Sequence, residues 1–155
     1  VTEDIFKIDI NFDLLLVEKH IIVNKMNTLE TKLGYRERII SMATNHLETI
    51  KTLNFIHDMS FLESAIKNSR WAKKLNKVQS SPVIGIIQNE QSKVIEFIKN
   101  HNTLKSIKVN DSQKVELNSQ KSVEQFLKLL DDDYLYSKLT EIDYSTTGNK
   151  NATVE

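Results

Sequence analysis

Five basic residues recur at helical spacing between Ser64 and Lys77, in a stretch that contains no acidic residue. They are Lys67, Arg70, Lys73, Lys74 and Lys77, with Lys73 at the margin of the shared face. Trp71 flanks this row. Lysine and arginine neutralise backbone phosphates and an indole can stack on a base, so the pattern is typical of a nucleic-acid surface. The alternative is a solvated outer face with Trp71 at the edge of the core.

A second cluster that could do chemistry is the acidic run Asp131-Asp132-Asp133. Carboxylates bind Mg²⁺ or Ca²⁺, but successive side chains point in different directions, and a metal requires more oxygen ligands than this run offers. The simpler interpretation is that Asp132 or Asp133 caps a short final helix that runs through Leu139. We therefore expect no metal and no cofactor, with a metal-dependent nuclease using Asp131 to Asp133 as the enzymatic alternative.

Other catalytic patterns are absent from the sequence. The four histidines are scattered, there is no cysteine, and three glycines in total argue against a glycine-rich phosphate loop. The sequence therefore predicts a protein that is not an enzyme.

Composition limits the remaining possibilities. The 155 residues carry 21 basic and 21 acidic side chains, so any attraction to nucleic acid must come from a local patch. Hydrophobic residues make up 39%, which is ordinary for one globular domain. No apolar run reaches the length of about 20 residues that a membrane helix requires, and the start does not resemble a signal peptide. A cytoplasmic protein is expected, and the strand-like start without methionine suggests a piece of a longer one.

Hydrophobic periodicity predicts the elements that must position these residues. Two β-hairpins are expected, one with strands at Ile5–Val17 and Ile21–Val23 and one spanning Lys105–Leu117. Helices are expected at Asn27–Gly34, Tyr35–Leu53, Phe61–Val78, Pro82–Asn100 and Ser119–Leu130. Ser60 and Glu63 are expected to form a capping box at the start of the third of these helices. A last short strand is expected at Ile142 and Tyr144.

Because strands and helices do not alternate one by one, the predicted fold class is α+β. We expect two β-hairpins that form a small, mostly antiparallel sheet packed against about four to five helices. The predicted domain spans residues 1–144, followed by a flexible tail at 145–155.

Four segments, in this order and spacing, resemble the KwaB-like family of the bacterial Kiwa anti-phage defence system. They are Phe12–Leu15 with His20–Asn24, Leu29-Glu30 with Gly34-Tyr35, Ala72–Leu75, and Leu130–Leu135 with Ser137, Leu139-Thr140, Tyr144 and Lys150. Leu29 stands where a phenylalanine is expected and Asp131 where an asparagine is commoner. Members of the family are longer, and this chain resembles their C-terminal half.

The resemblance implies a cytoplasmic, DNA-binding defence effector that acts with a membrane-embedded Kiwa partner and is recruited by it to the inner membrane. Its segment Ala72–Leu75 overlaps the basic row, so the nucleic-acid-binding candidates are Lys67, Arg70, Trp71, Lys73, Lys74 and Lys77. The alternative function is a protein-interaction or dimerisation module without DNA contact. Zero net charge and the tyrosines near Leu129–Thr140 favour that alternative, which would allow a homo-oligomer.

Overall fold

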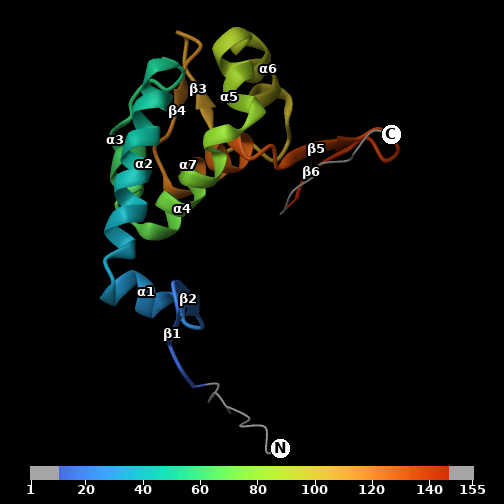
Figure 1. The fold of residues 1–155 in the computed structure, drawn as a ribbon. Coiled ribbons are helices and arrows are strands. Elements are labelled where there is room, and N and C mark those ends of the chain that lie inside the picture. Colours follow the sequence, from blue (N-terminus) through green and yellow to red (C-terminus); the bar gives the residue numbers. More distant parts are fainter. Residues whose placement is uncertain (1–10, 147–155) are drawn as a thin grey trace, which may run out of the picture. The chain divides into compact units, whose positions relative to one another are not determined.

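A computed structural model of the chain describes residues 11–146 as seven α-helices, one 3-10 turn and three separate two-stranded antiparallel sheets (Figure 1). The predicted α+β class is confirmed. The chain divides into two compact units, residues 1–39 and 40–155, and each is described by itself.

In the first unit, β1 (Leu14–Val17) pairs antiparallel with β2 (His20–Val23), which confirms the predicted first hairpin. The predicted strand residues Ile5–Ile10 lie outside the described part of the chain. Helix α1 (Met26–Lys32) follows, and Gly34 ends that segment with φ +66°, the left-handed conformation that favours glycine. The Asp13 carboxylate joins hairpin and helix, since it accepts from Lys25 Nζ at 2.7 Å and from Thr28 Oγ1 at 2.8 Å.

Helix α2 (Tyr35–Thr52) confirms the helix predicted at Tyr35–Leu53. It begins in the first unit and continues into the second. The other helices of the second unit are α3 (Ser60–Ala65), α4 (Ser69–Lys77), α5 (Pro82–Asn89), α6 (Gln91–Asn100) and α7 (Gln120–Leu130), with a 3-10 turn at Val78–Ser80. Its strands are β3 (Lys108–Val109), β4 (Val115–Glu116), β5 (Tyr134–Ser137) and β6 (Ile142–Ser145).

The helix predicted at Phe61–Val78 is two helices, α3 and α4. Asn68 lies between them in an extended conformation, and its Oδ1 accepts from the backbone N–H of Arg70 at 2.9 Å. An asparagine side chain that caps a new helix competes with continuation of the previous one, which explains the break. The break matters for the basic row, because Lys67 lies in the connecting turn and the other four basic residues lie on α4.

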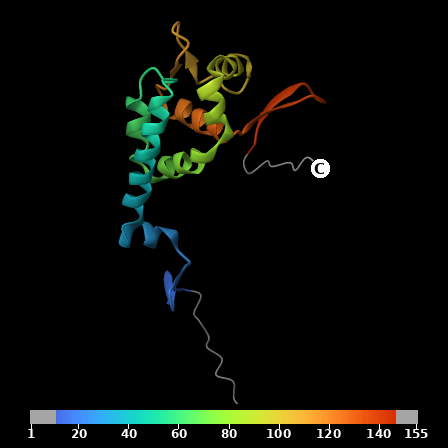
Figure 2. The ribbon, with the colours of Figure 1, turned by 45° about the horizontal axis from the view of Figure 1, so that its top comes forward.

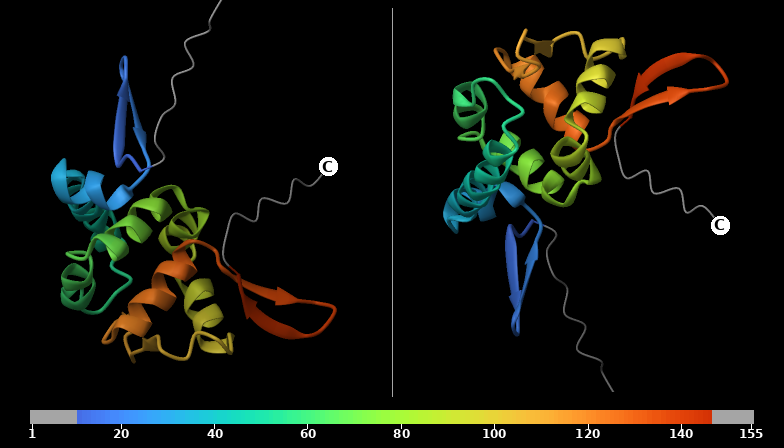
Figure 3. Two further views of the ribbon diagram at one scale, coloured as in Figure 1. Left: turned by 90° about the horizontal axis from the view of Figure 1, so that it is seen from below. Right: turned by 90° about the horizontal axis from the view of Figure 1, so that it is seen from above.

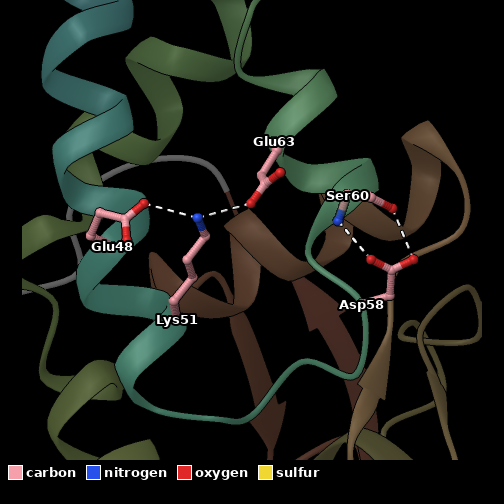
Figure 4. A network of polar contacts seen from close by, with 5 residues as sticks. All are labelled: Glu48, Lys51, Asp58, Ser60 and Glu63. Atoms are coloured by element: carbon pink, nitrogen blue, oxygen red, sulfur yellow. Dashed lines mark hydrogen bonds and ion pairs between the residues drawn. The ribbon is translucent and has the colours of Figure 1, made fainter.

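The predicted capping box of Ser60 with Glu63 is wrong. Ser60 is the first residue of α3, and the Asp58 carboxylate accepts both its backbone N–H and its hydroxyl at 2.8 Å (Figure 4). Glu63 instead accepts from Lys51 Nζ at 2.9 Å, and the same ammonium donates to Glu48 at 2.9 Å. The carboxylate that the pattern assigns to a cap therefore ties α3 to α2.

The helix predicted at Pro82–Asn100 also breaks in two. Ser81 caps α5 as predicted, accepting from the Val83 N–H at 3.1 Å, with Pro82 at the first helical position. Glu90, at φ −136° and ψ 53°, ends α5 and precedes α6. These two breaks account for seven helices where four to five were expected.

The two predicted hairpins do not join into one sheet, because β1–β2 and β3–β4 each form a two-stranded sheet of their own. Within the second unit, Figures 2 and 3 show β5–β6 as a hairpin that projects away from the helices. A third hairpin, β5–β6, pairs Tyr134 with Ser145 and Ser137 with Ile142. The predicted short helix through Leu139 is therefore wrong. Asp132 adopts φ +55°, which turns the chain out of α7 and into β5, so neither it nor Asp133 caps a further helix. The predicted last strand is confirmed as β6.

The core of the second unit is organised around α7. Val123, Phe126, Leu127 and Leu130 are buried on the face that the periodicity predicts. The buried apolar side chains of α3 and α5 lie in the same unit, and both helices contact α7. Helix α4 buries Trp71, Ala72 and Leu75, which leaves its basic side chains on the opposite face.

Candidate nucleic-acid interface

The basic row divides into two parts in the structure. Lys67, Arg70, Lys73 and Lys77 are exposed, and Lys74 is half-buried. Lys74 and Lys77 retain 34% and 51% of their side-chain surface, and both face carboxylates from α7. We call Lys67 and Arg70 the outer pair, and Lys74 and Lys77 the inner pair.

In the outer pair, Lys67 lies in the turn before α4 and Arg70 lies in the first turn of α4. Within residues 11–146, neither Lys67 nor Arg70 takes part in an ion pair. Both side chains are cationic and solvent-exposed. They are therefore available to an anionic ligand without first breaking an ion pair.

Trp71 lies beneath the row and is only 8% exposed. The guanidinium of Arg70 and the ammonium of Lys74 each lie 5.3 Å from the centroid of its ring. At that distance the ring face attracts both cations. The structure thus places the indole at the edge of the core, where it orients two cations, and not where a base could stack on it.

The inner pair is held by α7. Lys74 Nζ lies 3.4 Å from Glu124 Oε1, and Lys77 Nζ donates to Asp131 Oδ2. The hydrogen bond from Lys77 to Asp131 raises the pKa of the lysine above its ordinary value, with a further contribution from the charge of Asp133. The basic row and the acidic run, which the sequence presents as separate features, therefore meet at one place.

A pocket of about 240 Å³ lies where α4 and α7 meet. Its polar lining residues are Lys74, Lys77, Lys128, Asp131 and Asp133, and Val78 and Leu127 provide its apolar wall. The sequence interpretation missed Lys128. Its position in the sequence could have indicated this role. Lys128 lies in the last turn of α7, three residues before Asp131, and this spacing places the two side chains on one side of the helix end.

The three aspartates differ in environment. Asp131 is the C-terminal cap residue of α7, Asp132 is exposed in the left-handed conformation, and Asp133 is only 5% exposed. Within residues 11–146 no group of three or more histidine, aspartate or glutamate side chains is arranged to hold a metal ion. No helix among these residues is both long and apolar enough to cross a membrane.

The β5–β6 hairpin carries a second exposed surface of a different kind. Tyr136, Leu139 and Ile142 are 55%, 94% and 60% exposed. The hairpin is anchored through β6, because Asp143 Oδ2 accepts from the Asn102 N–H at 2.8 Å and Asp143 Oδ1 lies 3.7 Å from Nε2 of the buried His101. This is an apolar surface on an anchored arm, not a charged one.

Comparison with known proteins identifies the family. The family model described as Kiwa protein KwaB-like matches residues 1–140. The chain is 31% identical over 144 residues to the Kiwa protein KwaB of Escherichia coli O55:H7 (strain RM12579 / EPEC), a match that covers 91% of this chain and 45% of that relative. No solved structure matches the chain significantly. The chain spans less than half the length of this relative, and its assignment to the C-terminal half stays a prediction. Because the family model matches most of its length, the chain belongs to the KwaB-like family of Kiwa proteins.

Proposed function

We propose that this chain is part of an anti-phage defence protein and binds DNA through the basic face of α4 and the turn before it, with Lys67 and Arg70 making the principal contacts. The observation that carries the proposal is an exposed cationic face, free of acidic residues from Ser64 to Lys77, on a chain with zero net charge. Membership of the KwaB-like family supports a part in anti-phage defence.

The proposed contacts are electrostatic. Arg70 and the lysines on successive turns of α4 follow one side of a helix that Trp71 anchors in the core. A cation that neutralises a phosphate releases condensed counterions, and this gives affinity without reading the sequence of the bases. The buried indole leaves no aromatic platform on this face, so double-stranded DNA, with its bases stacked inside, fits it better than a single strand.

The proposal is tested by fluorescence anisotropy with a labelled duplex of random sequence. Between about 50 and 200 mM salt, affinity should fall by about 10- to 150-fold if two to four phosphates are contacted. Absence of binding at the lower salt concentration would overturn the proposal.

A matched pair of variants locates the surface. Lys67→Glu/Arg70→Glu/Lys73→Glu should abolish binding, because it reverses the charge of three exposed residues of the row. The triple variant Lys99→Glu/Lys105→Glu/Lys108→Glu changes net charge equally at exposed lysines on and after α6 and should retain binding. Equal loss in both would show that net charge alone matters.

The family resemblance also supports a membrane-embedded Kiwa partner for the cytoplasmic chain. Co-purification with a small multi-helix membrane protein encoded beside this gene would support that part of the proposal. A chain that never co-purifies with such a neighbour when both are expressed would contradict it.

A second candidate function is protein interaction through the β5–β6 hairpin, in the form of self-association or partner binding. Its exposed Tyr136, Leu139 and Ile142 favour this function, because aromatic and aliphatic side chains are enriched in interface cores. Sedimentation velocity at high concentration tests the self-associating form. A strict monomer, unchanged by Leu139→Ser/Ile142→Ser, would count against it.

A further inference from the structure

Asp131 occupies an unfavourable position for its own helix. It is the C-terminal cap residue of α7, where the helix dipole disfavours a negative charge. Its carboxylate, 24% exposed, is instead bound by Lys77 from α4. The interaction that holds the carboxylate is therefore tertiary, and the cation that holds it belongs to the proposed DNA-binding row.

The pocket around this ion pair has the size and the chemistry of an anion site. Its volume of about 240 Å³ is far above the minimum of about 10–15 Å³ that one water needs. Lys74, Lys77 and Lys128 converge on it from two helices. These three ammonium groups face three carboxylates, namely Asp131 and Asp133 in the lining and Glu124 on Lys74. The pocket is thus electrically balanced while Asp131 is charged.

We propose that this pocket is a seat for a backbone phosphate, formed by Lys74, Lys77 and Lys128, and that the Asp131 carboxylate fills it in the free chain. Asp131 then acts as an internal competitor that weakens DNA binding. A carboxylate and a phosphate oxygen accept the same charge-assisted hydrogen bond from an ammonium group, so each can replace the other on Lys77. This inference rests on the proposed DNA binding, deepens it by naming Lys128 as a further contact, and assigns a regulatory role to Asp131.

The test measures duplex binding of Asp131→Asn, with Asp132→Asn as the matched control. Both variants remove one negative charge from adjacent positions, and asparagine is tolerated in the left-handed conformation of residue 132. At about 100 mM salt, where charges farther apart than about 10 Å are screened, Asp131→Asn should bind about three- to fivefold more tightly than wild type. Asp132→Asn should gain less than about twofold.

Two further variants assign the gain to the pocket. In a Lys77→Gln background, Asp131→Asn should gain no more than the Asp132→Asn control, because the cation released by the substitution is gone. In the Asp131→Asn background, Lys128→Gln should lose at least about half of the gain. Thermal unfolding followed by circular dichroism should show all variants folded, since each replaces one polar side chain by another of similar size.

The outcomes separate this inference from the proposed function. Wild-type binding with equal gains in Asp131→Asn and Asp132→Asn overturns the phosphate seat alone. No binding by either wild type or Asp131→Asn at about 50 mM salt overturns both proposals. Binding by Asp131→Asn alone supports the seat. Inorganic phosphate is titrated in parallel by NMR, and a chain whose Asp131→Asn variant binds free phosphate but gains no DNA affinity would also overturn the seat for DNA.

Discussion

The outer and inner pairs of the basic row have the same charge in the sequence and different surroundings in the structure. Lys67 and Arg70 are exposed and outside any ion pair among the described residues. Lys74 and Lys77 are paired with Glu124 and Asp131, which lie 50 and 54 residues further along the chain. The difference shows that the electrostatic strength of a helix face depends on the neighbour that packs beside it. A row of evenly spaced cations is therefore not a row of equal binding sites.

Trp71 connects the two pairs, since its ring lies 5.3 Å from both the Arg70 guanidinium and the Lys74 ammonium. Trp71→Ala should lower the free energy of unfolding by about 3–5 kcal/mol, because the side chain is almost fully buried. Denaturant unfolding measures this loss.

Trp71→Leu separates packing from base stacking, because leucine keeps part of the buried apolar volume but has no ring on which a base could stack. It should keep DNA affinity within about twofold while costing about 2–3 kcal/mol of stability. If Trp71 stacked on a base, the same substitution would weaken single-strand binding far more than the loss of stability explains. That result would move Trp71 from the core edge to the binding surface.

Neutralising the outer pair should weaken duplex binding strongly. Lys67→Gln/Arg70→Gln is expected to lower affinity by about 10- to 100-fold at about 50 mM salt, since two phosphate contacts and their counterion release are lost. Lys105→Gln/Lys108→Gln is the matched control and should lose less than about twofold. Equal losses in the two double variants would remove the distinction between the outer pair and ordinary surface lysines.

Removing both members of an inner ion pair should change DNA affinity and stability little. Lys77→Gln/Asp131→Asn removes one charge of each sign, so net charge is conserved, and affinity should stay within about twofold of wild type. Stability should change by less than about 1 kcal/mol, because the pair is partly exposed. An affinity loss as large as that of the outer double variant would show that Lys77 already contacts DNA in the wild-type chain.

The smallest expected effect is on the pKa of Lys77. Asp131→Asn should lower the pKa of Lys77 towards its ordinary value, because the hydrogen bond to Asp131 is the main cause of its upward shift. A raised lysine pKa means that the pair adds stability below the ordinary pKa and that this stability is lost as pH rises through the raised value. NMR of the lysine side chain across the alkaline range measures the shift. An unchanged pKa in Asp131→Asn, matching Asp132→Asn, would contradict the pairing.

Some features that depend on local sequence are predicted correctly, although the cap that Asn68 forms on α4 is missed. Ser119 caps α7 and its Oγ accepts from the Ser122 N–H at 3.1 Å, and the apolar stripe that follows is buried as the period indicates. The same holds for Ser81 before α5 and for the β1–β2 hairpin. In each case neighbours within a few residues provide the deciding interaction.

Features that depend on partners far away in the chain are not predicted from the sequence. The segment after α7 becomes β5 because it pairs with β6 and because Asp143 of β6 accepts from the Asn102 N–H, and neither interaction leaves a periodic signal. For the same reason the sequence places Lys74 and Lys77 correctly on the basic face but cannot show that α7 brings two carboxylates to them. Lys128 is missed because its role exists only where the two helices meet.

The surface that DNA contacts can be mapped residue by residue. We would titrate the ¹⁵N-labelled chain with a short duplex and follow the backbone amides and the lysine and arginine side chains. The largest shifts are expected from Lys67 to Lys74, with the Lys67 and Arg70 side chains responding before Lys77. Shifts confined to the β5–β6 hairpin, with α4 unchanged at saturating duplex, would contradict DNA binding by the basic face and favour a different surface.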